Sequence, residues 1–299
     1  NCRFCEMLRT SQSRRALSAS VSEQTTQMKN RILIILFLTF MGMFSNLFGQ
    51  KKYPEEWNFY MTNVEDKPAS IYINLGLHKH IPLKEKSNLC WIAIKLNNPT
   101  ENGLTTDGES KTLFEIEDKI LEIINATNTI YIGRLTSDGF RDFYFYSKDV
   151  NEFKNNAQKI TSKYTNYEFI IDTKNDKNWS GYLDIYPNET DFQSISNRDV
   201  LENLEKNGDN LSKARDVFHW IYFKNENDRQ KYIDIVKKEN FEVVNENYNK
   251  KEKLPFSIQI KRIDKVGYGD IDEYTLYLWK LAKENNGDYD GWETSVETE

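Results

Sequence analysis

Three histidines are the first side chains in this sequence that could bind a metal or transfer a proton. His78 and His80 stand two residues apart, and this spacing places both on one face of a strand. A protein metal site of this type needs a third ligand, and none accompanies the pair, so we expect both to be solvated. His219 lies in an aromatic run and is expected to pack. The histidines therefore predict neither a metal site nor a cofactor.

Three cysteines offer a second possible chemistry. Cys2 and Cys5 have the CxxC spacing of redox and metal sites, but they lie in a polar leader. No second cysteine pair or histidine pair is present to complete a zinc site. Cys90 lies in an apolar, strand-like run and is predicted to be a buried small hydrophobe.

Arg134 and Arg141 flank a predicted hairpin turn formed by Ser137, Asp138 and Gly139. From neighbouring strands the two guanidinium groups could bind an anion or a carboxylate, which they match with paired hydrogen bonds. The alternative, which we favour, is that both are ordinary exposed or cross-strand charges. They are kept as candidate ligand-binding residues.

The remaining candidate site residues lie in an acidic and aromatic run near the C-terminal end. Its carboxylates could act as general acids or bases, but such catalysis needs a cleft and opposed environments, and the sequence indicates neither. We expect Trp292 to pack and the acids to face solvent. The candidate partner-binding residues of this run are Asp288, Tyr289, Asp290, Trp292 and Glu293. Because GxSxG, HExxH and P-loop motifs are also missing, the chain is predicted not to be an enzyme.

The composition is that of a globular protein. Hydrophobic residues make up only 38% of the chain, but aromatics contribute 13%, and each large ring buries much apolar area. The formal net charge is −6 with both signs interspersed, which disfavours direct binding of nucleic acid through phosphate neutralisation. An acidic protein is better suited to a basic or neutral protein partner.

Residues 28–50 have the layout of a secretory signal peptide. Lys29 and Arg31 precede an apolar run from Ile32 to Phe44, and a short polar region follows. The run is shorter than the about 20 apolar residues of a membrane-spanning helix, so no permanent membrane span is expected after cleavage near Gly49 or Gln50. The alternative is a buried hydrophobic helix. Export to the periplasm or medium is predicted if the leader is cleaved, and a cytoplasmic location if it is not. Residues 1–27 are then upstream or vector-derived sequence.

Residues 53–187 are predicted to form a first α+β module. A hairpin of two strands precedes strand 88–96, where apolar residues on both faces indicate a central strand. Helices are expected after Thr106, which forms a capping box with Glu109, and after Asp149. From residue 88 the predicted order is β-α-β-β-α-β, which is the ferredoxin-like pattern. The other predicted strands are 57–62, 69–77, 129–136, 140–146 and 167–172.

Residues 196–299 repeat that order. Helix 198–206 precedes an aromatic strand at 216–224, in which Phe218, Trp220 and Tyr222 alternate with His219, Ile221 and Phe223. Further strands are predicted at 242–245, 256–261 and 288–296. One helix is expected to be capped by Asn225 or Asn227, and the next by Asp270 with Glu273. Gly287 fits the left-handed position that ends the last helix. The fold prediction is therefore α+β, with two ferredoxin-like sandwiches in tandem after a signal peptide.

The first module resembles domain-of-unknown-function family 695 of bacterial proteins. The matching residues are Trp57-Asn58-Phe59-Tyr60, Lys67-Pro68-Ala69-Ser70-Ile71, Asn102-Gly103-Leu104, Tyr131-Ile132-Gly133-Arg134-Leu135-Thr136 and Gly139-Phe140-Arg141-Asp142-Phe143. The resemblance covers nearly the whole module and implies no established activity.

The second module resembles the regulator of ribonuclease E activity B family, which are small cytoplasmic protein inhibitors of an RNA-degrading enzyme. The run LWKLAKENNGDYDGWETSVE carries the best match, and VLENLEKNGDNLSKARDVFHWIYF matches the family's opening helix, Gly-Asp loop and first strand. The resemblance implies a ferredoxin-like fold that works by protein–protein contact. Two features depart from the family: the long acidic tail is missing at Glu299, and an export signal would separate the chain from a cytoplasmic ribonuclease.

These observations favour a protein-binding or regulatory protein that acts without catalysis on an unidentified protein partner. One alternative is an enzyme or binding module that acts on an anionic ligand at Arg134 and Arg141. Another is a cytoplasmic ribonuclease E regulator, if the leader is not an export signal. A structural, envelope-associated role without a defined ligand is a further alternative.

Overall fold

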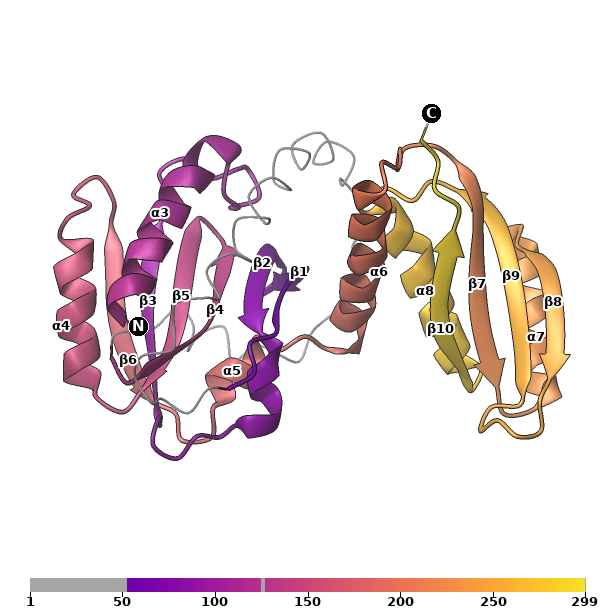
Figure 1. Ribbon diagram of the computed structural model, residues 1–299, viewed down its shortest axis with the longest axis horizontal. Coiled ribbons are helices and arrows are strands. Elements are labelled where there is room, and N and C mark those ends of the chain that lie inside the picture. The colour runs from indigo at the N-terminus through magenta and orange to yellow at the C-terminus, as the bar shows by residue number, and fades with distance from the viewer. Residues whose placement is uncertain (1–52, 125–126, 299) are drawn as a thin grey trace. The chain divides into compact units, whose positions relative to one another are not determined.

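The computed structural model describes residues 53–124 and 127–298, and these divide into two compact units. Unit 1 ends at Asp191 and unit 2 begins at Phe192. Each is a mixed α+β unit built on one antiparallel sheet, as Figure 1 shows. The predicted signal peptide, the upstream residues 1–27, and Cys2 and Cys5 all lie outside the described residues.

Unit 1 has a six-stranded sheet in the order β1-β2-β4-β5-β3-β6, with every neighbouring pair antiparallel. The elements are β1 (Trp57–Val64), β2 (Lys67–Asn74), the 3-10 helix η3 (Leu75–His80), β3 (Asn88–Lys95), α3 (Asp107–Ile124), β4 (Thr129–Ser137), β5 (Phe140–Ser147), α4 (Val150–Thr161), β6 (Phe169–Asn175) and α5 (Ser180–Asp184).

The main core of unit 1 lies between this sheet and helices α3 and α4. Cys90, Ile92 and Ile94 of β3 face the two helices, and Ile116 and Ile120 of α3 pack against them. Each fully buried aliphatic side chain of this size contributes about 1.5–3 kcal/mol relative to an exposed one. Residues 89, 91 and 93 are buried on the opposite face, so β3 is covered on both sides as predicted.

Two helix starts were predicted from capping patterns, and both helices begin where expected, but one of the two caps was wrong. The carboxylate of Asp149 accepts a hydrogen bond from the backbone N–H of Glu152 at 2.9 Å, which confirms the cap of α4. Glu109, by contrast, does not form the predicted box with Thr106. Its carboxylate instead accepts hydrogen bonds from the backbone N–H groups of Asn97 and Asn98, just beyond β3. Glu109 therefore ties the end of a strand to the first turn of α3.

The short helix α5 and the residue before it contact the opposite face of the unit 1 sheet. Trp179, which precedes α5 with a positive φ of 58°, stacks on Tyr146 with a centroid distance of 3.8 Å. Asp176 accepts hydrogen bonds from the Tyr146 hydroxyl at 2.5 Å and from the backbone N–H of Gly181 at 2.8 Å. Burial opposes ionisation of Asp176, but these hydrogen bonds outweigh it and lower the pKa of this carboxyl. An ionised Asp176 therefore fixes α5 to the sheet.

Unit 2 has a four-stranded antiparallel sheet in the order β10-β7-β9-β8. Helix α6 leads into it and begins at Glu189, nine residues before the predicted start at Arg198. The elements are α6 (Glu189–Lys206), β7 (Arg215–Phe223), α7 (Glu226–Val236), the 3-10 helix η4 (Lys237–Glu239), β8 (Glu242–Tyr248), β9 (Phe256–Asp264), α8 (Asp270–Glu284) and β10 (Gly287–Thr294).

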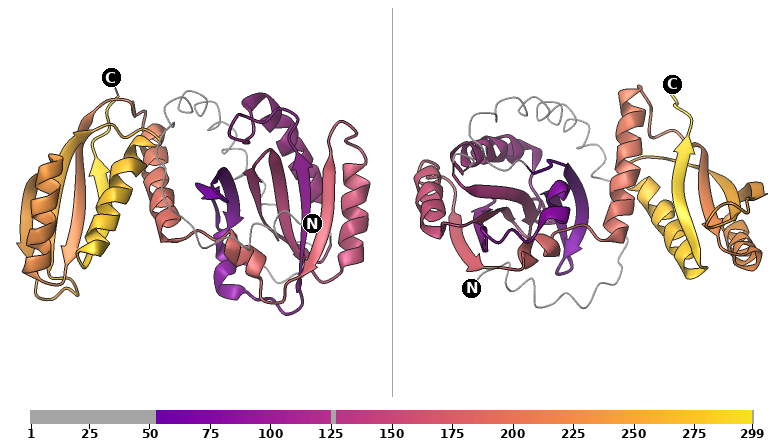
Figure 2. Two further views of the ribbon diagram at one scale, coloured as in Figure 1. Left: turned by 180° about the vertical axis from the view of Figure 1, so that it is seen from behind. Right: turned by 60° about the horizontal axis from the view of Figure 1, so that its bottom comes forward.

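Helices α7 and α8 lie on one face of the unit 2 sheet, which we call the inner face (Figures 1 and 2). Ile221 and Phe223 of β7 point into the core that these helices form, together with Ile258 and Ile260 of β9. Asn225 caps α7, because its side chain accepts a hydrogen bond from the N–H of Asp228 at 2.9 Å. The predicted cap at Asp270 was wrong, since α8 begins at that residue and Gly269 precedes it without a side-chain cap.

Gly287 does not end helix α8 in the left-handed conformation that was predicted for it. Asn286 takes that conformation, with φ of 56°, and Gly287 is already the first residue of β10. Gly287 pairs with Phe223, and a Cβ at this position would lie 2.5 Å from the Phe223 ring. Because that ring is fully buried, glycine is required here by the close approach of two strands.

We expect Gly287→Ala to lower the free energy of unfolding of unit 2 by about 1–3 kcal/mol, because the buried ring cannot move away freely. Gly108→Ala is the matched control: Gly108 lies in α3, and no atom is within 4 Å of the place where an added methyl group would lie. This control should be neutral or mildly stabilising. Urea denaturation of the full chain measures both. Equal stability of the two variants would show that contact with Phe223 does not constrain this position.

Candidate functional site

The face of the unit 2 sheet opposite to α7 and α8 carries the strongest candidate site, which we call the outer face. Pairing between the strands fixes its members, because directly opposed residues point to the same side of a sheet. They are Asp216, Phe218, Trp220 and Tyr222 of β7, Glu242, Asn245 and Asn247 of β8, Ser257, Gln259, Lys261 and Ile263 of β9, and Asp288, Gly291 and Glu293 of β10.

An aromatic stripe runs along the outer face. Phe218, Trp220 and Tyr222 follow one another at every second position of β7, which lies between β10 and β9. All three are only half-buried, and none of them belongs to the hydrophobic cores of unit 2. Ile263 on β9 adds an apolar side chain that is 68% exposed. Large rings held in this way by a sheet are typical of contact surfaces.

Acidic side chains border the stripe on the β10 side. Asp288 pairs with Tyr222, and Glu293 pairs with Phe218. Asp290, at a bulge in β10, lies near enough to Tyr222 that its charge adds to burial in raising the pKa of that phenol. All three carboxylates are exposed, and among the described residues none of them forms an ion pair.

The opposite border, on β9, carries a cation that is already neutralised. The amino group of Lys261 lies 3.4 Å from Asp216 and 3.7 Å from Glu242. It also lies 5.9 Å from the centre of the Phe218 ring. The net negative charge of the outer face is therefore concentrated along β10.

Gly291 leaves a gap beside the middle ring of the stripe. It pairs with Trp220, and no atom lies within 4 Å of the position that a Cβ would occupy. Its φ of 147° belongs to a region that favours glycine, and this conformation accompanies the bulge between Tyr289 and Gly291. One edge of Trp220 is thus left without a neighbouring side chain on β10.

Two of the predicted site residues, Tyr289 and Trp292, point away from the outer face. Trp292 donates a hydrogen bond from its ring nitrogen to the side-chain oxygen of Asn197 at 2.9 Å. The Tyr289 hydroxyl lies 2.8 Å from Nδ1 of His219. The structure therefore separates this run into two packing aromatics and the three exposed acids Asp288, Asp290 and Glu293.

His219 is a packed residue, as expected. Its ring is fully buried, with edge-on contacts to Phe241 and Tyr274. Burial, and secondarily the charge of Arg262, lowers its pKa to about 3. The imidazole is therefore neutral at physiological pH and holds Tyr289 against the central strand.

A buried ion pair fixes the end of strand β10. Nη1 of Arg215 lies 2.5 Å from the carboxylate of Asp209, and both side chains are almost completely buried. The same guanidinium donates to the backbone carbonyl groups of Asn210 and Ser295. Asp209 in turn accepts the backbone N–H of Glu297 at 2.7 Å. Removal of one partner from such a pair typically costs about 3–5 kcal/mol, so this clamp holds the acidic strand in register.

Arg134 in unit 1 is engaged by a carboxylate of the same unit. A bulge at Ile132, next to Gly133, places Tyr131 and Arg134 on the helix side of the sheet. Nη1 of Arg134 lies 2.7–2.8 Å from both carboxylate oxygens of Glu117, which also accepts the Tyr131 hydroxyl at 2.9 Å. Burial alone would lower the pKa of Arg134, but the charge of Glu117 outweighs it and raises that pKa, so the guanidinium group stays charged.

Arg141 is buried next to Phe114 of helix α3. Its Nε donates to the Thr136 hydroxyl at 3.1 Å, and Nη2 donates to the Thr105 hydroxyl at 3.0 Å. The guanidinium groups of Arg134 and Arg141 lie 5.0 and 5.3 Å from the centre of the Phe114 ring. The structure therefore brings the two predicted arginines to one aromatic side chain, with both already bonded to neighbours.

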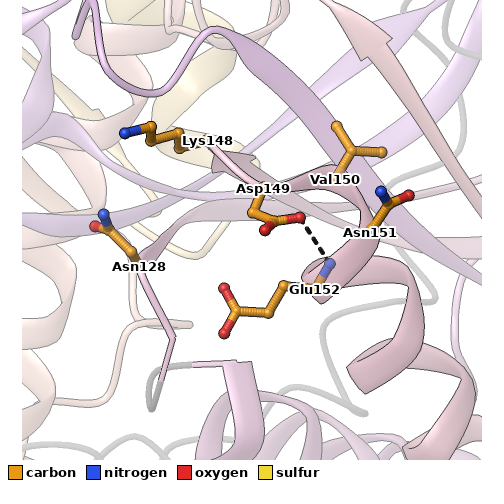
Figure 3. A pocket seen from close by; sticks show the side chains of 6 residues that line it. All are labelled: Asn128, Lys148, Asp149, Val150, Asn151 and Glu152. Carbon is orange, nitrogen blue, oxygen red and sulfur yellow. Dashed lines mark hydrogen bonds between the residues drawn. The ribbon is translucent and has the colours of Figure 1, made fainter.

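A shallow hollow lies at the start of α4 in unit 1. Figure 3 shows that its lining side chains spread around the opening and do not converge on one point. The carboxylate of Asp149 is occupied by its cap of the Glu152 N–H. The lining residues are Asn128, Lys148, Asp149, Val150, Asn151 and Glu152.

His78 and His80 lie in the 3-10 helix η3, so the prediction that they share one face of a strand was wrong. Both are exposed, and His78 stacks on Tyr186 with a centroid distance of 4.0 Å. Across residues 53–124 and 127–298, no three His, Cys, Asp or Glu side chains are grouped to hold a metal ion. Within the same ranges, no helix has the length and apolar character needed to cross a membrane.

Sequence reasoning noted the alternation in β7 but did not assign its outer residues to a site. The available signal was that apolar side chains occupy both faces of a strand in a module with too few helices to cover both. No sequence pattern predicts the gap at Gly291, because the gap depends on which residue of β7 pairs with this glycine.

Comparison with known proteins gives two family matches and weak likenesses to solved structures. A search of the curated proteins found no match. A crystal structure of an unknown protein from Galdieria sulphuraria matches 71% of this chain and 99% of its own, with 11% identity and a TM-score of 0.19. That likeness is too low to inform the fold or the function.

The family matches follow the two units closely. The first covers residues 55–186, and the second covers residues 194–294 and includes the whole outer face. The chain thus matches, in tandem, the model of the family of unknown function DUF695 and the model of the family described as regulator of ribonuclease activity B.

Proposed function

We propose that this chain is a regulatory protein that binds another protein through the outer face of unit 2 and performs no catalysis. The observation that carries the proposal is the half-exposed aromatic stripe of β7 beside the exposed acids of β10. Aromatic side chains that present a rigid surface are the residues that most often dominate binding energy at protein interfaces. The family match of this unit supports the same mode of action.

The charge of the outer face defines the chemistry of the partner. Asp288, Asp290 and Glu293 attract a basic protein surface, whereas a nucleic-acid phosphate backbone would be repelled. Exposed ion pairs of this kind add specificity and association rate more than affinity. We therefore assign the affinity to the rings and the orientation of the partner to the acids.

We further propose that both units are ferredoxin-like sandwiches. In each unit the strand that begins the βαββαβ order pairs with the third and fourth strands of that order: β3 with β5 and β6, and β7 with β9 and β10. The second strand then lies at the far side of the third. This arrangement of two interleaved βαβ units supports the assignment, and it leaves one face of the unit 2 sheet available.

The identity of the partner depends on where the chain resides. Export, which the predicted leader favours, places it with a partner in the periplasm or outside the cell. A chain that keeps its leader in the cytoplasm would have ribonuclease E as its first candidate partner. An anionic ligand at Arg134 and Arg141 has less support, because Glu117 neutralises the first and two threonines bind the second.

Site-specific photo-cross-linking tests the docking face in cells of the native host. We expect a chain with p-benzoylphenylalanine in place of Tyr222 to give a discrete adduct with one protein. The same probe in place of Tyr277, which is 40% exposed on α8, is the matched control and should give none. The captured protein, once purified, should bind the unmodified chain, and Asp288→Lys with Glu293→Lys should weaken binding about tenfold or more.

Charge reversal of Asp234 and Glu273, which are exposed on α7 and α8, provides a control of equal net charge. Equal adducts at positions 222 and 277, or equal weakening by both charge-reversed pairs, would contradict docking at the outer face.

Export has its own test. We expect the native protein to be recovered outside the cytoplasm with a mature N-terminus near Lys51, because signal peptidase removes a leader of this layout. Fractionation and N-terminal sequencing measure both. A cytoplasmic protein that keeps its leader would contradict export and make ribonuclease E the partner to examine.

A further inference from the structure

We infer that the outer face of unit 2 takes an extended basic segment with three positively charged side chains at alternating positions, of which the middle one is an arginine on Trp220. This inference rests on the proposed function and specifies the partner of that same surface. It follows from the order in which rings, acids and the glycine gap succeed one another along β7 and β10.

The spacing of the outer face matches the spacing of an extended chain. Alternate residues of a strand are about 6.6–6.8 Å apart, so the rings of Phe218, Trp220 and Tyr222 stand at that interval. Glu293 and Asp288 are opposite the first and the third ring, and Gly291 is opposite the second. An extended segment along β7 would place its alternate side chains next to these three positions in turn.

The two outer positions require a positive charge. Asp288 and Asp290 lie together at the Tyr222 end, and Glu293 lies at the Phe218 end. Within the described residues these carboxylates have no cationic partner, and each is exposed enough to accept one. Basic side chains at both ends of the segment would neutralise them.

The middle position selects a planar cation. At Trp220 the β10 side offers no side chain, because residue 291 is a glycine with open space where a Cβ would lie. A guanidinium group is flat, stacks on an indole face and gives up its hydration more readily than an ammonium group. Its unstacked N–H groups would then point toward the carboxylates on either side. Lysine could supply the charge at this position but not the stacking.

Lys261 confines the segment to the β7–β10 half of the sheet. Its amino group is paired with Asp216 and Glu242. Of the acids near the stripe on this side, Glu252 in the turn between β8 and β9 lies near Tyr222, at one end of the stripe. A basic segment that shifted toward β9 would have to displace Lys261 from these two carboxylates. The segment is therefore placed over β7 and the edge strand β10.

Peptides with a defined pattern test this inference on the full chain. The probe is a fluorescent serine-rich peptide with arginine at three alternating positions, and its affinity is measured by anisotropy at low and physiological salt. Replacement of Asp288 by Asn and Glu293 by Gln should weaken binding about threefold to tenfold. The control pair Asp234→Asn and Glu273→Gln changes the net charge equally on α7 and α8 and should weaken it less than twofold.

The middle arginine is tested by a coupling measurement. Exchange of that residue for lysine should weaken binding to the native chain about twofold to fivefold. With Trp220→Leu, which removes the indole and keeps an apolar side chain, the same exchange should have no effect. Urea denaturation of the Trp220→Leu variant checks that unit 2 is folded.

The outcomes separate the two proposals. If the arginine-to-lysine exchange weakens binding equally with and without Trp220, while the Asp288 and Glu293 pair still matters, the arginine position is wrong and the docking face stands. If the outer-face pair and the control pair weaken binding equally, attraction comes from net charge alone, and both the inference and the proposed docking face are wrong.

Discussion

Strand β7 has large apolar side chains on both of its faces, and within residues 192–298 the helices of unit 2 cover only one of them. The inner side chains Val217, Ile221 and Phe223 are completely buried against helices or neighbouring strands. Because the side-chain period of a strand is two, Phe218, Trp220 and Tyr222 must then lie on the other face. A slip of one residue would bury the wrong set, so burial of the inner face fixes the outer one. The proposed docking surface is therefore a consequence of the core.

Several contacts within unit 2 maintain this arrangement. The clamp between Arg215 and Asp209 holds the C-terminal end of β10, and Asn197 of α6 accepts a hydrogen bond from Trp292 on the same strand. Gly287 allows β10 to approach β7 closely at its other end. An edge strand fixed at both ends keeps its acids at constant distance from the aromatic stripe. The acids themselves contribute little to folding, because exposed charges add almost nothing to stability.

Local patterns in the sequence predicted what local forces determine. The order of strands and helices, the buried faces of β3 and β7 and the caps at Asp149 and Asn225 follow from side-chain period and from the first turn of a helix. The errors concern contacts between distant residues. The Glu109 carboxylate accepts a hydrogen bond from the backbone just beyond β3 and does not cap its own helix. Glycine is required at position 287 by the Phe223 ring and not by the end of α8. Arg134 meets Glu117 only because a bulge turns it to the helix side, and no spacing rule predicts that bulge. The site depends on such pairing, so its residues could be grouped only once the register was known.

The most direct test of the docking surface is the response of the tryptophan indole N–H signals to the three-arginine peptide in a nitrogen-15 NMR spectrum. The chain has six tryptophans. Trp91, Trp179 and Trp292 are buried, whereas Trp57, Trp220 and Trp279 are half-buried. Trp220 lies on the outer face, while the half-buried Trp279 on α8 and Trp57 on β1 report on other surfaces. We predict that the Trp220 signal, assigned by its loss in Trp220→Phe, shifts with peptide concentration while those of Trp279 and Trp57 stay in place. A shift of Trp279 or Trp57 with Trp220 unmoved would contradict this prediction.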